Sequence, residues 1–273
     1  MRNPRLGRTL ATLLCSLGIA LAPLAAPAQT KPARTELGGD SSLSILWVGN
    51  SFFYYNNSMH GHYRELANSL EPKAGFRGVS VTISGSGIDW HDMDTYLKPG
   101  LIGKYSFVPG NKIVFNKEGR QFDAVMMMDC SQCPVHPDLK PVFHETAKSH
   151  IAKVVKYGAR PVLFMSWAYK DAPEMTAQLA EQYTIAGNAN DALVVPAGLA
   201  FARAIGKRPD LELYAKDKRH PSLAGTYLGA ATVYAAIRGK SPVGSTYTAG
   251  LDPELATFLQ TMAWEAVKEY YGK

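Results

Sequence analysis

The stretch that decides the fold is Ser44-Ile45-Leu46-Trp47-Val48-Gly49-Asn50-Ser51. Its first five residues form a short, mostly apolar run that Gly49 ends, which predicts a buried β-strand followed by a turn. A strand that is apolar without alternation is buried on both faces, as in a parallel sheet. We therefore expect Ser51 at the carboxyl end of this strand, where open parallel sheets form their sites.

Strand-like and helix-like segments alternate along the rest of the chain. This alternation predicts an α/β fold, with a parallel sheet covered by helices on both faces. One segment, 89–121, departs from the alternation, and its Gly, Pro and Asn residues predict an inserted loop or hairpin near the site. The other predicted strands are 78–83, 123–128, 160–165 and 192–195, and the predicted helices are 58–70, 144–157, 173–186, 197–205, 225–237 and 252–270.

The N-terminus has the pattern of a signal peptide. Three arginines precede an apolar stretch (9–24), and Ala26-Pro27-Ala28 is a cleavage signal. The stretch is shorter than the ~20 apolar residues that a spanning helix needs. We therefore expect a secreted or periplasmic protein without stable membrane insertion. The predicted organisation is a signal peptide at 1–28, a flexible leader at 29–43 and a single domain at 44–273.

Composition sets bounds on the mature protein. Removing 28 of the 273 residues leaves 245, a length that fits one α/β domain. The formal charge of +6 falls to +3, because three arginines leave with the signal. No basic cluster with interleaved aromatic residues is present, so we expect no nucleic-acid partner.

Two short segments could carry nucleophilic chemistry. Ser51 stands between a predicted strand and a predicted helix, where backbone N–H groups can stabilise negative charge; the alternative is an N-cap serine. The second segment is Asp217-Lys218-Arg219-His220. An imidazole can take a serine proton when a nearby carboxylate holds its tautomer, whereas the alternative is a solvated charged turn.

Two loops could supply donors to an oxyanion. In Ser84-Gly85-Ser86-Gly87, after the second strand, glycine lets a backbone N–H approach a substrate closely. In Cys130-Ser131-Gln132, after the third strand, a side-chain amide could donate. The alternatives are a flexible turn and a surface glutamine.

The order of these four segments resembles that of the SGNH, or GDSL-like, hydrolases, and the segments around Cys130, Phe164 and Pro221 look like a bacterial branch of that family. The resemblance implies a flavodoxin-like three-layer α/β/α sandwich with a central parallel sheet. It also implies hydrolysis of ester bonds, often in acylated carbohydrates, with no metal or organic cofactor. The implied roles are nucleophile for Ser51, base for His220, orienting carboxylate for Asp217, and oxyanion donors for Gly87 (or Gly85) and Gln132.

This sequence departs from the family pattern at two positions. Asn50 replaces the usual aspartate before the nucleophile, and Gln132 stands where the family has asparagine. A one-residue slip in the second alignment would select Ser131 instead.

Two other functions stay open at this point. One is a carbohydrate- or lipid-binding protein that kept the fold and lost turnover. The other is a thiol-disulfide protein using Cys130 and Cys133, which otherwise form a disulfide or stay free thiols. Trp167, after the fourth strand, either stacks on a sugar or packs beside the site.

Overall fold

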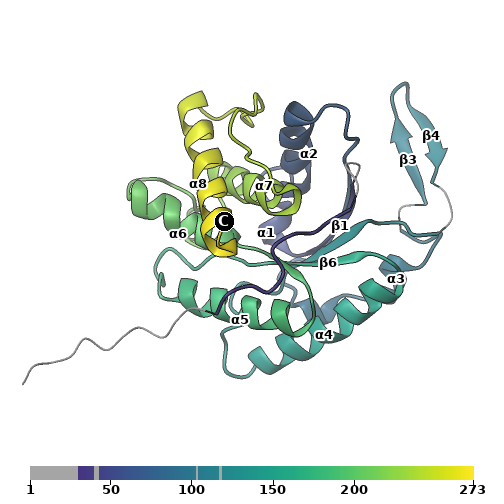
Figure 1. Cartoon of the computed structure of the whole chain (residues 1–273), viewed down its shortest axis with the longest axis horizontal. Coiled ribbons are helices and arrows are strands. Elements are labelled where there is room, and N and C mark those ends of the chain that lie inside the picture. The colour runs from purple at the N-terminus through teal and green to yellow at the C-terminus, as the bar shows by residue number, and fades with distance from the viewer. Residues whose placement is uncertain (1–29, 40–42, 103, 117–118) are drawn as a thin grey trace, which may run out of the picture.

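The computed structural model describes residues 30–39, 43–102, 104–116 and 119–273 (Figure 1). Its centre is a five-stranded parallel sheet in the order β2-β1-β5-β6-β7. Counted along the chain within this sheet, the order is second, first, third, fourth, fifth, as in flavodoxin-like folds. The predicted fold class is confirmed. The strands are β1 (Ser44–Gly49), β2 (Arg77–Thr82), β5 (Ala124–Met127), β6 (Arg160–Phe164) and β7 (Leu193–Val195).

Four of the five strands, the interior β1, β5 and β6 and the edge strand β7, are the apolar runs of the sequence. All residues of β5 and β7 are buried, and only the first residue of β1 and of β6 is partly exposed. β2 lies at the edge of the sheet and is half-buried throughout. Every predicted strand is confirmed to within one residue at each end.

Helices form the two outer layers (Figure 1). α7 is buried from Ala224 to Ile237, because it lies between the sheet and other helices. α4 begins four residues before its predicted start, since Pro141 in its first turn has a backbone angle suited to a helix start. One layer holds α2 (Met59–Leu70), α6 (Ala197–Lys207), α7 (Leu223–Arg238) and α8 (Pro253–Tyr271), and the other holds α3 (Met93–Leu97), α4 (Lys140–Lys156) and α5 (Met175–Ala189).

The inserted segment forms a hairpin. β3 (Tyr105–Val108) and β4 (Lys112–Phe115) pair antiparallel and stand out from the body of the molecule (Figure 1). The segment starts beyond the carboxyl end of β2, in the 3-10 helix η1 (Ile88–Trp90). It returns to the amino end of the sheet, where the Gln121 carbonyl accepts a hydrogen bond from Ser44 Oγ at 3.1 Å. Therefore only the first part of the segment lies at the end of the sheet where we predicted the site.

The segment predicted as a flexible leader is held against the domain over residues 30–39. The Ala33 N–H donates to Asn188 Oδ1 at 2.7 Å, Arg34 forms an ion pair with Asp191, and Leu37 is buried. These contacts with the end of α5 give the segment a fixed path that its polar composition did not predict. The predicted signal peptide lies outside the described residues. Within the described ranges, no helix combines the length and apolar character needed to cross a membrane.

Candidate functional site

Ser51 lies at the carboxyl end of β1, as predicted, and begins the four-residue helix α1 (Ser51–Tyr54). Asn50 is the N-cap of this helix, and its Oδ1 accepts a hydrogen bond from the Phe52 N–H at 3.2 Å. The N-cap role that we considered for Ser51 therefore belongs to Asn50. The Ser51 side chain is left free to engage another residue.

The structure brings Ser51, His220 and Asp217 together. Ser51 Oγ lies 2.8 Å from His220 Nε2, although the two residues are 169 positions apart. His220 Nδ1 is hydrogen-bonded to Asp217 Oδ2. The three side chains thus form one continuous chain of hydrogen bonds, the arrangement in which a carboxylate orients an imidazole toward a hydroxyl.

The loop that carries Asp217 and His220 is tightly bent. Lys218 has a φ of 65°, and the Ala215 N–H donates to the His220 carbonyl at 2.8 Å. Asp217 Oδ1 accepts hydrogen bonds from the Arg219 and His220 N–H groups, both at 3.0 Å. The spacing of three residues in the sequence becomes a direct contact because the backbone folds around the carboxylate.

The environment of Asp217 favours its ionised form. Burial opposes ionisation, but the hydrogen bonds from the His220 side chain and from two backbone N–H groups outweigh it and lower the pKa of Asp217 to about 2. Asp217 is therefore a carboxylate across the neutral pH range, able to stabilise a positive charge on the imidazole.

Aromatic rings hold the imidazole of His220 in place. Tyr55 stacks on it with ring centroids 4.2 Å apart and an angle of 7°, and Phe52 meets it edge-on at 5.4 Å. Both residues belong to the segment that follows Ser51. The α1 segment therefore supplies the candidate nucleophile and also limits the rotation of its partner.

Trp167 packs below the site and does not face a ligand. It is fully buried, with one ring face on Phe52 at 4.7 Å and the other on Phe201 at 4.2 Å. Its Nε1 donates to the Arg219 carbonyl at 2.9 Å, which fixes the loop before His220. Stacking on a sugar is excluded, because both faces of the ring are covered.

Two backbone N–H groups, those of Ser51 and Gly87, bear on the predicted oxyanion site. Among the described residues, neither the Ser51 N–H nor the Gly87 N–H has a hydrogen-bond acceptor. Gly87 is buried, and a Cβ there would lie 2.4 Å from Asp89 Oδ1 and 3.3 Å from Asp129 Oδ1. Gly85 is exposed with a φ of 71° and open space around it, so it is a turn glycine. Of the two alternatives, Gly87 is the one that lies beside the polar network of the site.

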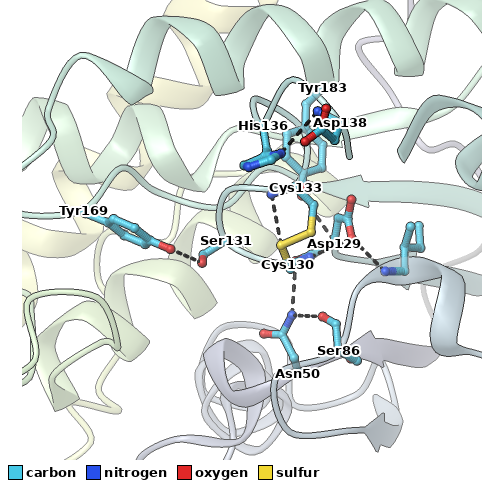
Figure 2. The surroundings of a disulfide bond; sticks show 11 residues. Asn50, Ser86, Asp129, Cys130, Ser131, Cys133, His136, Asp138, Tyr169 and Tyr183 are labelled. Carbon is cyan, nitrogen blue, oxygen red and sulfur yellow. Dashed lines mark hydrogen bonds between the residues drawn. A yellow bond between two sulfur atoms is a disulfide. The ribbon is translucent and has the colours of Figure 1, made fainter. Parts of the chain in front are cut away.

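A buried network joins the loops that follow β1, β2 and β5 (Figure 2). Asn50 Nδ2 donates to the carbonyls of Ser86 at 3.0 Å and Asp129 at 3.1 Å. Asp129 Oδ1 accepts from the N–H groups of Ile88 and Cys130, both at 2.7 Å. The orientation of the Gly87–Ile88 peptide is thereby fixed by a carboxylate from a different loop.

Asp129 titrates at an unusual pH for an aspartate. It is only 2% exposed. Burial raises its pKa to about 6, although the two N–H donors act in the opposite direction. The unfolded chain, with an ordinary pKa of 3.8, loses this proton first as the pH rises. The contribution of Asp129 to the free energy of unfolding therefore falls as the pH rises from about 4 to about 6.

Asp129→Asn should remove this pH dependence. Each pKa unit corresponds to about 1.4 kcal/mol. Between pH 4 and pH 7, the free energy of unfolding of the wild type should therefore fall by roughly 3 kcal/mol relative to that of the variant. Denaturant unfolding at several pH values measures the difference. Asp210→Asn, at an exposed site, is the control. A difference between wild type and Asp129→Asn that stays constant with pH would contradict the assignment.

Gln132, the residue that the resemblance implies as an oxyanion donor, is exposed. Among the described residues its side-chain amide has no hydrogen-bond partner, whereas its backbone carbonyl accepts hydrogen bonds from the Val135 and His136 N–H groups, both at 2.9 Å. Ser131, the alternative, is half-buried with its hydroxyl 2.6 Å from that of Tyr169 (Figure 2). The structure does not hold the Gln132 amide in place for the role that the resemblance implies.

Cys130 and Cys133 form a disulfide (Figure 2). A thioredoxin-like motif would open a helix, but α4 begins only at Lys140, after a further loop. Within the described residues, the one group with metal-ligand spacing is Asp129 with these two cysteines. Because the two sulfurs are bonded to each other, they do not provide thiolate ligands.

Two residues of this site, Asp129 and Tyr55, were not predicted from the sequence. Asp129 is an acidic residue directly after an otherwise apolar strand, and that isolated charge was a usable signal. Tyr55 gives no comparable signal, because nothing in its neighbourhood indicates that it stacks on a residue 165 positions away.

Comparison with solved structures identifies the fold. No protein-family model matches the chain, and no curated protein matches it by sequence. A DUF4886 family protein from Bacteroides uniformis is similar with a TM-score of 0.56 and 16% identity, over 83% of this chain and 95% of that one.

Two further structures carry hydrolase descriptions. A protein from Slackia heliotrinireducens, assigned to the SGNH hydrolases, has a TM-score of 0.52 and 22% identity over 71% of this chain and 98% of its own. A catalytic mutant of an acetylxylan esterase from Geobacillus stearothermophilus has a TM-score of 0.53 and 15% identity over 72% and 95%. The chain therefore has the fold of the SGNH, or GDSL-like, hydrolases.

Proposed function

We propose that this protein is a serine ester hydrolase with Ser51 as nucleophile, His220 as general base and Asp217 as the carboxylate that orients it. The observation that carries the proposal is the unbroken hydrogen-bond chain from Asp217 through His220 to Ser51 Oγ. In a solvated charged turn without a catalytic role, the imidazole would have no reason to be hydrogen-bonded to a serine at the end of the first strand.

The first half-reaction is acyl transfer to the serine. His220 Nε2 takes the Ser51 proton while Oγ attacks the ester carbonyl, and the carbonyl oxygen becomes an oxyanion. We assign the Ser51 and Gly87 N–H groups as its donors, since neither is engaged elsewhere among the described residues. The protonated His220 then gives its proton to the leaving alcohol, and the acyl group stays on Ser51.

The second half-reaction hydrolyses the acyl-enzyme and regenerates the free enzyme. His220 deprotonates a water molecule, which attacks the acyl carbonyl, and the proton then passes back to Ser51 Oγ as the acid leaves. Asp217 stabilises the imidazolium at both stages through the Nδ1 hydrogen bond. These residues complete the cycle with water as the only co-reactant.

The proposed substrates are small acyl esters, such as those of acylated carbohydrates. This rests on analogy with the family and with the acetylxylan esterase of the same fold. We further propose that the protein is exported, since Arg2, Arg5, Arg8 and the apolar stretch after them form a signal-peptide pattern. No nucleic-acid partner is proposed.

Asn50, one of the two departures from the family pattern, bears on the alternative of a binding protein without turnover. In the structure Asn50 caps α1 and joins two neighbouring loops through Nδ2, which an aspartate could not do as a donor. The departure from the family pattern therefore has a structural explanation that leaves the chemistry intact.

A fluorophosphonate probe tests the proposed function directly. Ser51 Oγ should attack the phosphorus and displace fluoride, and mass spectrometry of the digested protein should place the adduct on Ser51. Hydrolysis of p-nitrophenyl acetate should accompany labelling, and the heat-unfolded protein is the control. Failure to label, or labelling elsewhere, would refute the assignment, whereas labelling without turnover would favour the binding protein.

Gln132→Ala should change kcat by no more than about twofold. Strong oxyanion donors are preorganised, and exposed side chains without fixed contacts contribute within about 0.5 kcal/mol. Steady-state kinetics of Gln132→Ala and Ser131→Ala, side by side, measure both candidates. A loss of tenfold or more in kcat for Gln132→Ala alone would restore the donor role that the resemblance implies.

A further inference from the structure

The β3–β4 hairpin has one face made entirely of exposed apolar side chains. Tyr105 lies opposite Phe115 in the pairing register, and Phe107 lies opposite Ile113, so these four side chains share a face. Phe107 is 74% exposed and Phe115 is 70% exposed. Exposed apolar groups gathered in this way mark an interaction surface.

The aromatic rings form a contiguous cluster and are not scattered. The Tyr105 ring contacts that of Phe107 at a centroid distance of 5.7 Å and that of Phe115 at 6.3 Å. The hairpin stands away from the body of the protein (Figure 1). The proposed chemistry at Ser51 makes no use of these residues.

The charges on the hairpin are all of one sign. In the sequence, the stretch 98–116 contains three lysines and no acidic residue, and the first carboxylate after it is Glu118. Lys98, Lys104 and Lys112 are exposed, and none forms an ion pair within the described residues. By the same alternation Lys104 and Lys112 belong to the other face of the hairpin. Their long, flexible side chains can reach around a two-stranded ribbon, so the segment complements a surface that is both apolar and negatively charged.

We propose that this hairpin adsorbs to the surface of an anionic lipid bilayer. The rings of Tyr105, Phe107 and Phe115 would enter the interface, and the lysine side chains would extend from the other face of the hairpin to the anionic headgroups. A second copy of the chain could cover the rings but would bring like charges together. Four-residue strands are far shorter than the roughly ten residues of a spanning strand, so adsorption is superficial.

Sedimentation with vesicles tests this proposal independently of catalysis, and the Ser51→Ala protein can be used. Partitioning onto phosphatidylcholine vesicles containing 30% phosphatidylglycerol should exceed that onto pure phosphatidylcholine by at least about tenfold, and 0.5 M NaCl should reduce it. Phe107→Ser with Phe115→Ser should lower it by about tenfold or more. The double substitution Lys104→Gln and Lys112→Gln should lower partitioning onto the anionic vesicles toward the level seen with pure phosphatidylcholine.

Matched controls separate adsorption from misfolding and self-association. Val155→Ser with Ile185→Ser removes exposed apolar groups from α4 and α5 and should leave partitioning unchanged. On an otherwise wild-type background, the hairpin variants should keep the melting temperature and any activity on a small soluble ester. Equal binding to both vesicle types, or no effect of the phenylalanine changes, would overturn the proposal. So would a dimer in light scattering that the phenylalanine changes convert to a monomer.

Discussion

Ser51→Ala should lower ester hydrolysis by at least about a thousandfold, because it removes the proposed nucleophile. The protein should still fold, since among the described residues the Ser51 hydroxyl is hydrogen-bonded only to His220 Nε2, while Asn50 continues to cap α1. The measurement is kcat/KM on p-nitrophenyl acetate, together with fluorophosphonate labelling and a thermal melt.

Ser106→Ala is the matched control for this substitution. Ser106 is a half-buried serine in the hairpin whose hydroxyl donates to Asn116, away from the proposed chemistry. It should keep full activity. Near-wild-type turnover by purified Ser51→Ala would remove Ser51 from the mechanism, and the proposed function with it.

Asp217→Asn should lower kcat by up to about ten-thousandfold. An amide can donate to His220 Nδ1, which would place the imidazole proton on Nε2, facing Ser51, and the ring could then no longer accept the serine proton. The tautomer matters here because the Asp217 carboxylate and Ser51 Oγ bond to opposite nitrogens of the same ring. The pH dependence of kcat/KM should change in Asp217→Asn in the same way as in His220→Ala.

Asp171→Asn controls for the removal of one negative charge in this region. Asp171 is an exposed aspartate that pairs with Lys218 at 3.4 Å, beside the loop that holds Asp217. It should change kcat by no more than about twofold, as surface substitutions do. If Asp217→Asn and His220→Ala both kept the wild-type pH–rate profile, the hydrogen-bond chain would have no catalytic role, even if the fluorophosphonate probe labelled Ser51.

The candidate site was predictable where chemistry follows directly from strand ends. Ser51 was placed correctly because it follows β1 by two residues, and parallel strands bring their carboxyl ends to one edge of the sheet. The contact between Asp217 and His220 was also within reach, because only three positions separate them. The choice between Gly85 and Gly87 was not, because both stand in the same short loop with the same local signals.

Long-range packing decided the features that the sequence left open or that differed from its predictions. Asp129 contacts Ile88 across 41 positions, and Asn50 reaches the Asp129 carbonyl across 79. Trp167 became a packing residue because Phe52 and Phe201 cover its two faces. Contacts between residues so far apart in the sequence cannot be predicted from the pattern of neighbouring residues.

The sequence by itself determined the alternation of strands and helices, the parallel sheet and the position of Ser51. These follow from hydrophobic periodicity and from breaking residues, which act between near neighbours along the chain. Only the tertiary structure decided that Gly87 faces the buried carboxylate of Asp129, that Gln132 stays exposed and that residues 30–39 lie against α5. Those outcomes depend on which distant surfaces meet when the layers pack, because a buried polar group takes whichever partner the fold brings within hydrogen-bond distance.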